Sequence, residues 1–254
     1  MNPAAFGPVE AWSRLTHPNI VQVREAFTSQ AFNDNCTSFL SQPLSCPIRL
    51  NIHLALVVVY DYHPNAETLF DLHLKPKPTT FQNGRLQQSK DGPLPEQTLW
   101  SYIVQLASAI QVVHDAGLAM RVIDPTKILV TGKNRHETLI YHYSPHPHPS
   151  PRVRISSCCL VDILTYDPRQ SQDINIMQQE DLVYFGKLVF ELCCGQANAM
   201  ANLQKALQTI DKNYSQDVKN VALYLVKPAP HKSIRQLLDT IGSRVLLEMR
   251  ETQK

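Results

Sequence analysis

The sequence is poor in the features that mark several large classes of protein. Charged residues make up 18% of its 254 residues, which is too few for a disordered polyelectrolyte. Basic residues barely outnumber acidic ones, 24 against 22, so the charge does not indicate a nucleic-acid-binding surface. No apolar run approaches the roughly 18 residues of a membrane span, because Lys187 and Glu191 interrupt the longest candidate. The N-terminus has neither the basic nor the apolar region of a secretion signal, so we expect none.

The cysteines lack the spacing of a metal site. The six are Cys36, Cys46 and two adjacent pairs, Cys158–Cys159 and Cys193–Cys194. The absence of C-x-x-C excludes a zinc ribbon, and neighbouring cysteines are poorly placed to bridge each other. We therefore expect reduced cysteines that serve as small buried apolar residues in a cytosolic protein.

What the sequence does contain is a β-rich beginning. Little is expected to fold before Trp12. Alternating apolar residues at 20–23 predict a strand, and the wholly apolar stretch 54–62 predicts a second strand that is buried on both faces. Residues 73–95 are rich in lysine, proline, glutamine and glycine, and they predict a loop.

A long amphipathic helix is predicted between Pro95 and Gly117. Proline suits the first turn of a helix, and glycine suits a left-handed position just after its end. The apolar residues between them recur every three or four positions: Leu99, Ile103, Leu106, Ala107, Ile110 and Val113. The stripe is typical of a helix that packs on a core.

The second half of the chain predicts a hairpin and then helices. The hairpin strands are expected near 128–131 and 153–156. The stretch 178–195 is apolar on most faces and predicts a buried helix, and three amphipathic segments follow at 202–210, 216–226 and 233–248. The expected architecture is therefore α+β, with a small β-rich part followed by a larger, mostly helical part.

Three short motifs in this order resemble those of protein kinases. The sequence "HPNIV" (17–21) resembles the turn between helix C and strand 4, and "VVYDYHPNAETLFDL" (58–72) resembles strand 5, the hinge and helix D. The sequence "DLVYFG" (181–186) resembles the start of helix F. The resemblance implies a protein-kinase-like two-lobed fold, with a partial β-rich N-lobe and a mostly helical C-lobe.

The two loops that carry kinase chemistry are changed. When "RVIDPTKIL" (121–129) is aligned with H-R-D-L-K-P-x-N, the catalytic aspartate falls on Val122 and the metal-binding asparagine on Lys127. Ser157, Cys158 and Cys159 take the place of D-F-G. Phosphoryl transfer depends on those carboxylate and amide groups and on the ions they hold. The resemblance is therefore to a pseudokinase, with no catalytic residue and no metal ligand assigned.

A narrower resemblance rests on longer segments. The phrase R-V-x-D-P-T-K-I-L, the stretch "YDYHPNAETL" and residues 202–226 resemble the pseudokinase adaptor subunits of the poly(A)-nuclease deadenylation complex. The resemblance implies a non-enzymatic subunit that recruits the exonuclease subunit to messenger RNA and binds ATP without hydrolysing it. It also implies a homodimer that the intact protein links to poly(A)-binding protein and microRNA-silencing scaffold proteins. The expected location is cytoplasmic, including P-bodies, with no membrane association.

The resemblance also divides the chain. Residues 1–72 are expected to form a partial N-lobe and hinge, with an insert at about 36–54, and residues 73–247 a C-lobe, with an insert at about 136–152. Residues 248–254 are a possible start of a truncated coiled coil. The glycine-rich loop and the strand-3 lysine region of the family would lie upstream, and the αC glutamate falls near Pro8. We therefore expect ATP binding to be weakened or lost in such a fragment.

The candidate nucleotide site follows from the kinase alignment. Backbone groups of the hinge would hold the adenine edge, polar groups just beyond would reach the ribose, and Lys127 would neutralise phosphate charge without a metal ion. The candidate residues are Asp61, Tyr62, His63, Pro64, Asn65, Ala66, Glu67, Thr68, Thr126 and Lys127. The structural alternative is that Asp61 and Glu67 solvate the hinge and cap the helix after it.

Other readings remain open at this point. An atypical phosphotransferase could use relocated metal ligands, for which Asp124 and Asp162 are the candidates, and a non-functional truncated gene product is a further alternative. The insert carries four histidines, His136, His142, His146 and His148, which could bind a metal. Its prolines and the absence of further ligands favour an extended segment instead.

Three residues have expected structural roles. Asp181 should accept backbone hydrogen bonds from the loop around Met120 and Arg121, as the aspartate of helix F does in the kinase family. Arg121 should be structural, because no activation-loop segment that could carry a phosphate is recognisable. Trp100 should pack at the edge of the core, with a partner contact as the alternative.

Overall fold

The structure is a computed structural model. It describes residues 3–29, 55–76, 79–82, 85–88, 93–132, 151–169, 173–229 and 232–246. The insert at 36–54 and residues 248–254 lie outside the described residues, and so does most of the insert at 136–152, including its four histidines. The structure places Arg152, at the end of that second insert, in a strand.

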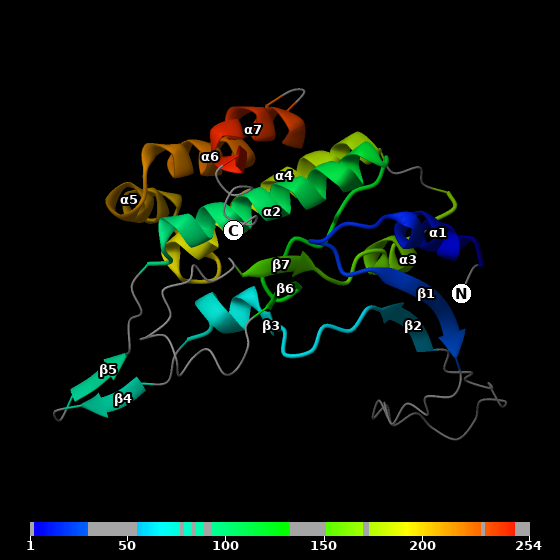
Figure 1. The fold of residues 1–254 in the computed structure, drawn as a ribbon, viewed down its shortest axis with the longest axis horizontal. Coiled ribbons are helices and arrows are strands. Elements are labelled where there is room, and N and C mark those ends of the chain that lie inside the picture. The colour runs from blue at the N-terminus through cyan, green and yellow to red at the C-terminus, as the bar shows by residue number, and fades with distance from the viewer. Residues whose placement is uncertain are drawn as a thin grey trace, which may run out of the picture.

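The N-terminal elements are a short helical segment and a two-stranded sheet. They are η1 (Pro3–Phe6), α1 (Gly7–Arg14), β1 (Val23–Ser29) and β2 (Ala55–Tyr60). The two strands are antiparallel, with Val23 opposite Tyr60 and Ser29 opposite Ala55. In Figure 1 they lie at the same end of the molecule as α1.

The middle of the chain joins this sheet to the first long helix. Its elements are β3 (Glu67–Thr68), η2 (Phe70–Leu74), β4 (Thr79–Gln82), β5 (Arg85–Gln88), α2 (Glu96–Asp115), β6 (Ile128–Thr131) and β7 (Arg152–Ile155). Strands β3, β6 and β7 form one antiparallel sheet with β6 in the centre. Ile20 adds a parallel bridge to Ile155, so the chain before β1 is tied to this sheet.

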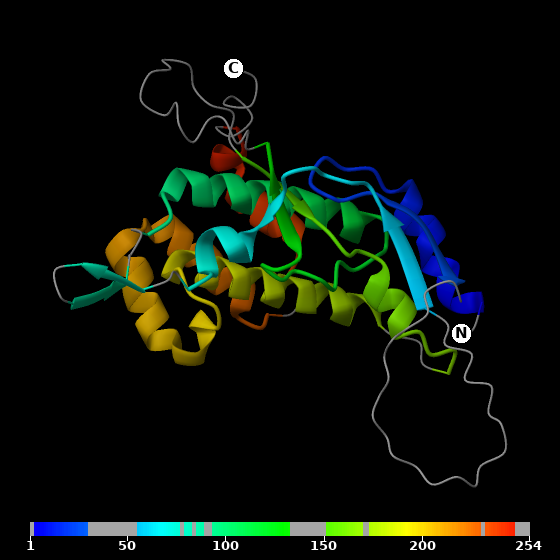
Figure 2. The same ribbon diagram turned by 90° about the horizontal axis from the view of Figure 1, so that it is seen from below.

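The remainder of the described chain is helical. It contains α3 (Leu160–Leu164), α4 (Ile174–Cys194), η4 (Ala199–Asn202), α5 (Leu203–Asn213), α6 (Gln216–Val226) and α7 (Ile234–Thr240). Figures 1 and 2 show α2 and α4 side by side along the length of the body, with β6 and β7 against them. In Figure 1, α5 lies at the end opposite α1, and α6 and α7 lie above α2 and α4.

Four of the predicted helices are confirmed as α2, α4, α5 and α6, whereas the helix predicted at 233–248 ends at Thr240. The ends of α2 and α4 follow from the sequence. Pro95 immediately precedes α2, and Gly117 adopts a left-handed φ of 73° just beyond it. Asp173 caps α4 by accepting the Asn175 N–H at 2.8 Å, and Gly195 ends the helix with a φ of 63°. Glycine takes this backbone conformation without the steric cost that a side chain adds.

The prediction that little folds before Trp12 is wrong. Residues 3–14 form η1 and α1, and the Trp12 side chain is only 1% exposed. Its indole Nε1 donates to Asp162 Oδ2 at 2.9 Å. A buried aromatic ring with a satisfied polar atom is enough to fix a short helix on the core.

Two predictions for strands and loops also need correction. Strand β2 is half-buried at every residue rather than buried on both faces, because β1 is its single partner in the described sheet. The expected loop at 73–95 contains the antiparallel pair β4 and β5, with Gln82 opposite Arg85. The sequence signal for it was the Asn83–Gly84 dipeptide, which is typical of two-residue hairpin turns.

One contiguous core runs through the described chain. It includes Trp12 and Val23 near the start, Phe185 and Phe190 on α4, and Ile241 after α7, all 4% exposed or less. Cys158, Cys159 and Cys193 are buried and Cys194 is half-buried; all four are free thiols, as expected. Cys36 and Cys46 lie outside the described residues.

Within the part of the chain that the structure describes, no helix is long and apolar enough to cross a membrane.

Candidate functional site

One buried carboxylate, that of Asp181, holds the loop between α2 and β6 in place. Asp181 on α4 is 0% exposed. Its Oδ2 accepts the Met120 N–H at 2.6 Å and its Oδ1 accepts the Arg121 N–H at 2.7 Å. The ring of His114, at the end of α2, places Nε2 2.9 Å from Oδ2. The predicted role of Asp181 is therefore confirmed, and the sequence interpretation missed His114.

The backbone of this loop is left-handed at Arg121 and turns sharply at Val122. Arg121 has a φ of 59° although it is not glycine, a conformation that costs free energy unless neighbouring groups fix it. The Val122 N–H donates to the Met120 carbonyl at 2.7 Å, so the chain turns sharply there. The Val122 side chain is half-buried and has no group that could accept a proton.

The serine–cysteine loop after β7 packs against the loop held by Asp181. Ser157 and Cys159 also have left-handed backbones, with φ of 62° and 71°. The Cys158 Sγ lies 3.6 Å from the Met120 sulfur, and the Cys158 carbonyl accepts the Tyr60 hydroxyl at 2.8 Å. Burial raises the pKa of the Cys158 thiol, so it is a neutral packing group. The two altered loops are thus in direct contact.

Asp162 joins three separate segments behind these loops. It accepts the Trp12 indole N–H at 2.9 Å and lies 3.5 Å from the Arg121 guanidinium. Burial raises the pKa of the Asp162 carboxyl above its ordinary value, although the Trp12 hydrogen bond and the Arg121 charge act in the opposite direction. Arg121 therefore has the structural role that the sequence indicated, and Asp162 serves to join α1, α3 and the loop.

The hinge residues connect β2 to β3 and include a turn at Pro64 and Asn65. The Asp61 carboxylate forms an ion pair with Arg24 at 2.5 Å, and that hydrogen bond lowers the pKa of Asp61. The Asp61 N–H donates to the Gln22 carbonyl at 3.0 Å, so this donor is already used. The Tyr62 side chain is 84% exposed. The backbone of His63 is the next candidate for an adenine edge, and burial lowers the pKa of its ring.

The sheet brings the remaining candidate residues together. Glu67 and Thr68 pair with Val130 and Leu129 of β6, which begins directly after Thr126 and Lys127. The Phe70 N–H also donates to the Pro125 carbonyl at 3.0 Å. The polar end of the hinge therefore lies beside the loop that carries Lys127. Pro64, Asn65 and Ala66 lie between His63 and Glu67 in the sequence, and Asn65 has a left-handed φ of 58°.

Several of these side chains already have local partners. Thr68 Oγ1 accepts the Asp71 N–H at 3.0 Å and donates to Asp71 Oδ2 at 2.7 Å. The N-cap residue of η2 is Leu69, and no side chain caps this helix. Thr126 donates its N–H to Asp124 Oδ1 at 2.8 Å. Lys127 is exposed, and its carbonyl accepts the Ser156 N–H at 2.8 Å.

The fold and the site together define a class of protein. The order of elements, the buried aspartate under a loop, and the short sheet beside a hinge are those of the C-lobe and adjoining N-lobe of a protein kinase. The sequence alignment predicts valine, lysine and serine at the positions of the chemical groups. The structure is therefore an α+β, protein-kinase-like fold of the pseudokinase class.

Comparison with known proteins identifies the family, although no family model matches the chain. The chain is 36% identical over 261 residues to the PAN2-PAN3 deadenylation complex subunit PAN3 of Drosophila melanogaster, and the match covers 95% of the chain. It is 34% identical over 261 residues to the human subunit of that name, with 96% of the chain covered. These matches span 28% and 25% of the two relatives' lengths.

Solved structures agree with the sequence comparison. The PAN3 pseudokinase of Drosophila melanogaster superimposes with a TM-score of 0.77 at 35% identity, over 100% of this chain and 55% of that one. PAN3 in a complex with PAN2 from Neurospora crassa superimposes with a TM-score of 0.74 at 29% identity, over 98% of this chain and 51% of that one. The chain belongs to the PAN3 family, and its fold is that of part of a PAN3 pseudokinase.

Proposed function

We propose that this chain is the kinase-like part of a non-catalytic adaptor subunit. The adaptor brings the exonuclease subunit of a cytoplasmic deadenylase to the poly(A) tail of messenger RNA. Its relatives are named as subunits of the PAN2-PAN3 deadenylation complex, and one of the similar solved structures is a PAN2–PAN3 complex. Homodimerisation, contacts with poly(A)-binding protein and silencing scaffolds, and location in P-bodies are further parts of the proposal for the full-length protein.

One observation carries the proposal. The backbone of the loop before β6 is held in shape by Asp181, through hydrogen bonds of 2.6 and 2.7 Å. In the sequence alignment with protein kinases, Val122, Lys127 and Ser157 fall at the positions where proton transfer and metal binding need carboxylate and amide groups. A frame that keeps its shape without those groups is suited to binding other molecules rather than to phosphoryl transfer.

Co-purification from cells tests the adaptor function. The tagged chain and the protein of the intact transcript are expressed in parallel, and captured proteins are identified by mass spectrometry. We expect the exonuclease subunit with the intact protein, and with this chain if the kinase-like part contributes a contact. Absence of the exonuclease from both captures would contradict the proposal. A chain that never accumulates in folded form would favour the alternative of a non-functional truncated gene product.

We also propose that the intact protein binds ATP without hydrolysing it. The Lys127 ammonium is exposed beside the β3–β6 pair, which supports a role in neutralising phosphate charge. Isothermal titration of the full-length protein with ATP should give a binding heat that Lys127→Glu removes and Lys205→Glu, on a distant helix, retains. No heat at millimolar ligand would contradict the proposal. A further titration of this chain would measure how much affinity the shorter form retains.

The rival function is an atypical phosphotransferase that uses Asp124 and Asp162 as metal ligands. The contacts of both carboxylates argue against it, because Asp124 accepts from Thr126 and Asp162 accepts from Trp12. Radiolabelled ATP provides the test. Turnover by the full-length protein that Asp162→Ala abolishes would favour the rival, whereas no transfer above a buffer control supports the adaptor.

A further inference from the structure

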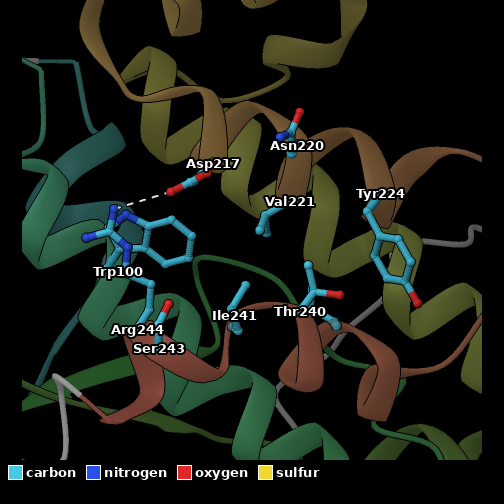
Figure 3. Close-up of a pocket in the computed structure, with 10 residues that line it drawn as sticks. Trp100, Asp217, Asn220, Val221, Tyr224, Thr240, Ile241, Ser243 and Arg244 are labelled. Carbon is cyan, nitrogen blue, oxygen red and sulfur yellow. Dashed lines mark hydrogen bonds and ion pairs between the residues drawn. The ribbon is translucent and has the colours of Figure 1, made fainter.

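A cavity of about 360 Å³ lies away from the altered loops, between α2, α6, α7 and residues 242–246. Figure 3 shows Val221 and Ile241 in its middle, with Trp100 at one end and Tyr224 at the other. Val221 and Ile241 are each 4% exposed, so the floor is apolar and well packed. The volume is at the lower end of the range for sites that bind small ligands or single side chains.

One end of the cavity carries a cation in a fixed orientation. The Arg244 guanidinium lies over the Trp100 ring, 5.1 Å from its centroid. The ring is 5% exposed, and its Nε1 donates to Glu96 Oε1 at 3.1 Å. A guanidinium stacked on a fixed ring presents its N–H edge in a defined plane, which suits two-point binding of a carboxylate.

Arg244 has a weak ion pair with Asp217 and also interacts electrostatically with the Glu96 carboxylate. Arg244 Nη2 lies 3.4 Å from Asp217 Oδ2, and the two side chains are 36% and 65% exposed. Long, solvent-exposed ion pairs contribute little to stability. A guanidinium has five N–H donors, and Asp217 is its one side-chain hydrogen-bond acceptor in the described parts of the chain. A better-placed carboxylate could therefore replace Asp217.

We propose that this cavity binds a short segment of a partner protein in which a branched apolar side chain lies beside a carboxylate. The apolar side chain covers Val221 and Ile241, and the carboxylate takes the place of Asp217 on Arg244. Polar side chains also line the cavity, namely Asn220, Thr240 and Ser243. They favour a peptide over a hydrocarbon chain, because peptide backbone groups need hydrogen-bond partners.

Binding of a peptide panel to the 254-residue chain tests the proposal. Fluorescently labelled glycine–serine peptides carry a central Leu-Asp, Leu-Glu or Ile-Glu pair, and their polarisation is measured. We expect at least one to bind more tightly than about 1 mM and to shift the indole N–H resonance of Trp100 but not that of Trp12. Replacing the acid by its amide, or the apolar residue by serine, should weaken binding by about fivefold or more.

The two members of the ion pair make opposite predictions. Arg244→Gln should weaken peptide binding about tenfold, whereas Asp217→Asn should strengthen it about threefold by removing the competing carboxylate. Arg235→Gln, which removes an exposed ion pair with Asp115 outside the cavity, is the matched control and should change nothing. Each variant's melting temperature establishes that it is folded. Since Asp217 is exposed, its variant serves even if Arg244→Gln unfolds.

Three outcomes would overturn the proposal. The first is that no peptide of the panel binds the unchanged chain. The second is that both variants shift affinity in the same direction, or that Asp217→Asn weakens binding. The third is that decanoate displaces the peptides and binds equally well to Arg244→Gln, which would assign the cavity to hydrocarbon instead.

Discussion

At the scale of single residues, the most consequential group is the Asp181 carboxylate, which touches no expected ligand position. It accepts two backbone N–H groups and contacts the His114 ring while it is fully buried. A buried charge is stable only when its hydrogen-bond partners are in place. The shape of the altered loop and the stability of α4 are therefore coupled through one side chain.

Asp181→Asn should lower the stability of the chain. The amide nitrogen of asparagine would face a backbone N–H that now donates to an oxygen. We expect a loss of about 3 kcal/mol, or roughly 6–12 °C in Tm for a chain of this size. Asp211→Asn, in an exposed pair with Lys219, is the control and should change Tm by little. A melt of Asp181→Asn that matches the control would contradict the alignment on helix F.

A pH dependence follows from Asp162. Burial raises its pKa in the folded chain above the ordinary value of 3.8, so the folded state binds that proton more tightly than the unfolded state does. The contribution of Asp162 to stability therefore decreases as pH rises from 3.8 through the folded pKa. Asp162→Asn stays neutral, and its Tm relative to the unchanged chain should rise as pH increases from 3.8 toward neutrality. A difference that is flat across this range would contradict the assignment.

The structural role of a single residue could be predicted where a short sequence motif identifies that residue. The sequence "DLVYFG" was enough to assign Asp181, and its two hydrogen bonds follow from the family frame. The role of Asp162 could not be read in the same way, because its partner Trp12 lies 150 positions away. Sequence periodicity does not report which way a side chain at the start of a five-residue helix points. The nucleotide site stays a prediction.

At the scale of elements, the approach of α4 to α6 depends on Gly186. A Cβ built at that position would lie 2.6 Å from Val226 Cγ1 and 2.8 Å from Leu225 Cβ. Those distances are shorter than any comfortable packing contact, so the two helices can be this close only with glycine there. The same glycine ends the motif that identified helix F.

Gly186→Ala should therefore destabilise the chain although alanine favours helices. The gain in helix propensity is about 1 kcal/mol, and forcing the helices apart costs about 1–3 kcal/mol, so Tm should fall. Gly242→Ala is the matched control, because its Cβ would have no atom within 4 Å. It should leave Tm unchanged or raise it slightly. If both variants gain stability in thermal melts, the close approach of α4 and α6 is not as described.

Elements with a strong period were predicted, and those fixed by partners were not. Helices α2, α4, α5 and α6 carry both an apolar stripe and end signals, so their bounds differ from the predicted ones by only a few residues. Helix α1 has eight residues and is fixed by one tryptophan. The burial of β2 depends on which other elements pack against the β1–β2 sheet, and the sequence of β2 alone does not determine this.

At the scale of the whole molecule, the β-rich and helical parts share one core. The Asn19 side chain joins them, because its Nδ2 donates to Gln105 on α2 at 2.8 Å and to the Val153 carbonyl of β7 at 2.7 Å. His17 adds a contact of 3.2 Å to Ser108. Buried polar links across an interface make separate unfolding of the two sides costly, since each would leave unsatisfied groups.

The chain should therefore unfold in one transition. Its two tryptophans report on the two parts, Trp12 on α1 and Trp100 on α2. In Trp12→Phe and in Trp100→Phe, the urea midpoint from the remaining tryptophan's fluorescence should coincide with the midpoint from circular dichroism. Two separated midpoints in either variant would show that the parts unfold independently.

The left-handed backbone at Arg121, Ser157 and Cys159 bears on how freely the neighbouring side chains can vary. The Asp181 carboxylate and the Tyr60 hydroxyl bind the main chain of the two loops that contain these residues. Neither hydrogen-bond set uses the side chain of Val122 or Ser157. A substitution at either position would therefore leave in place the hydrogen bonds that fix the two loops.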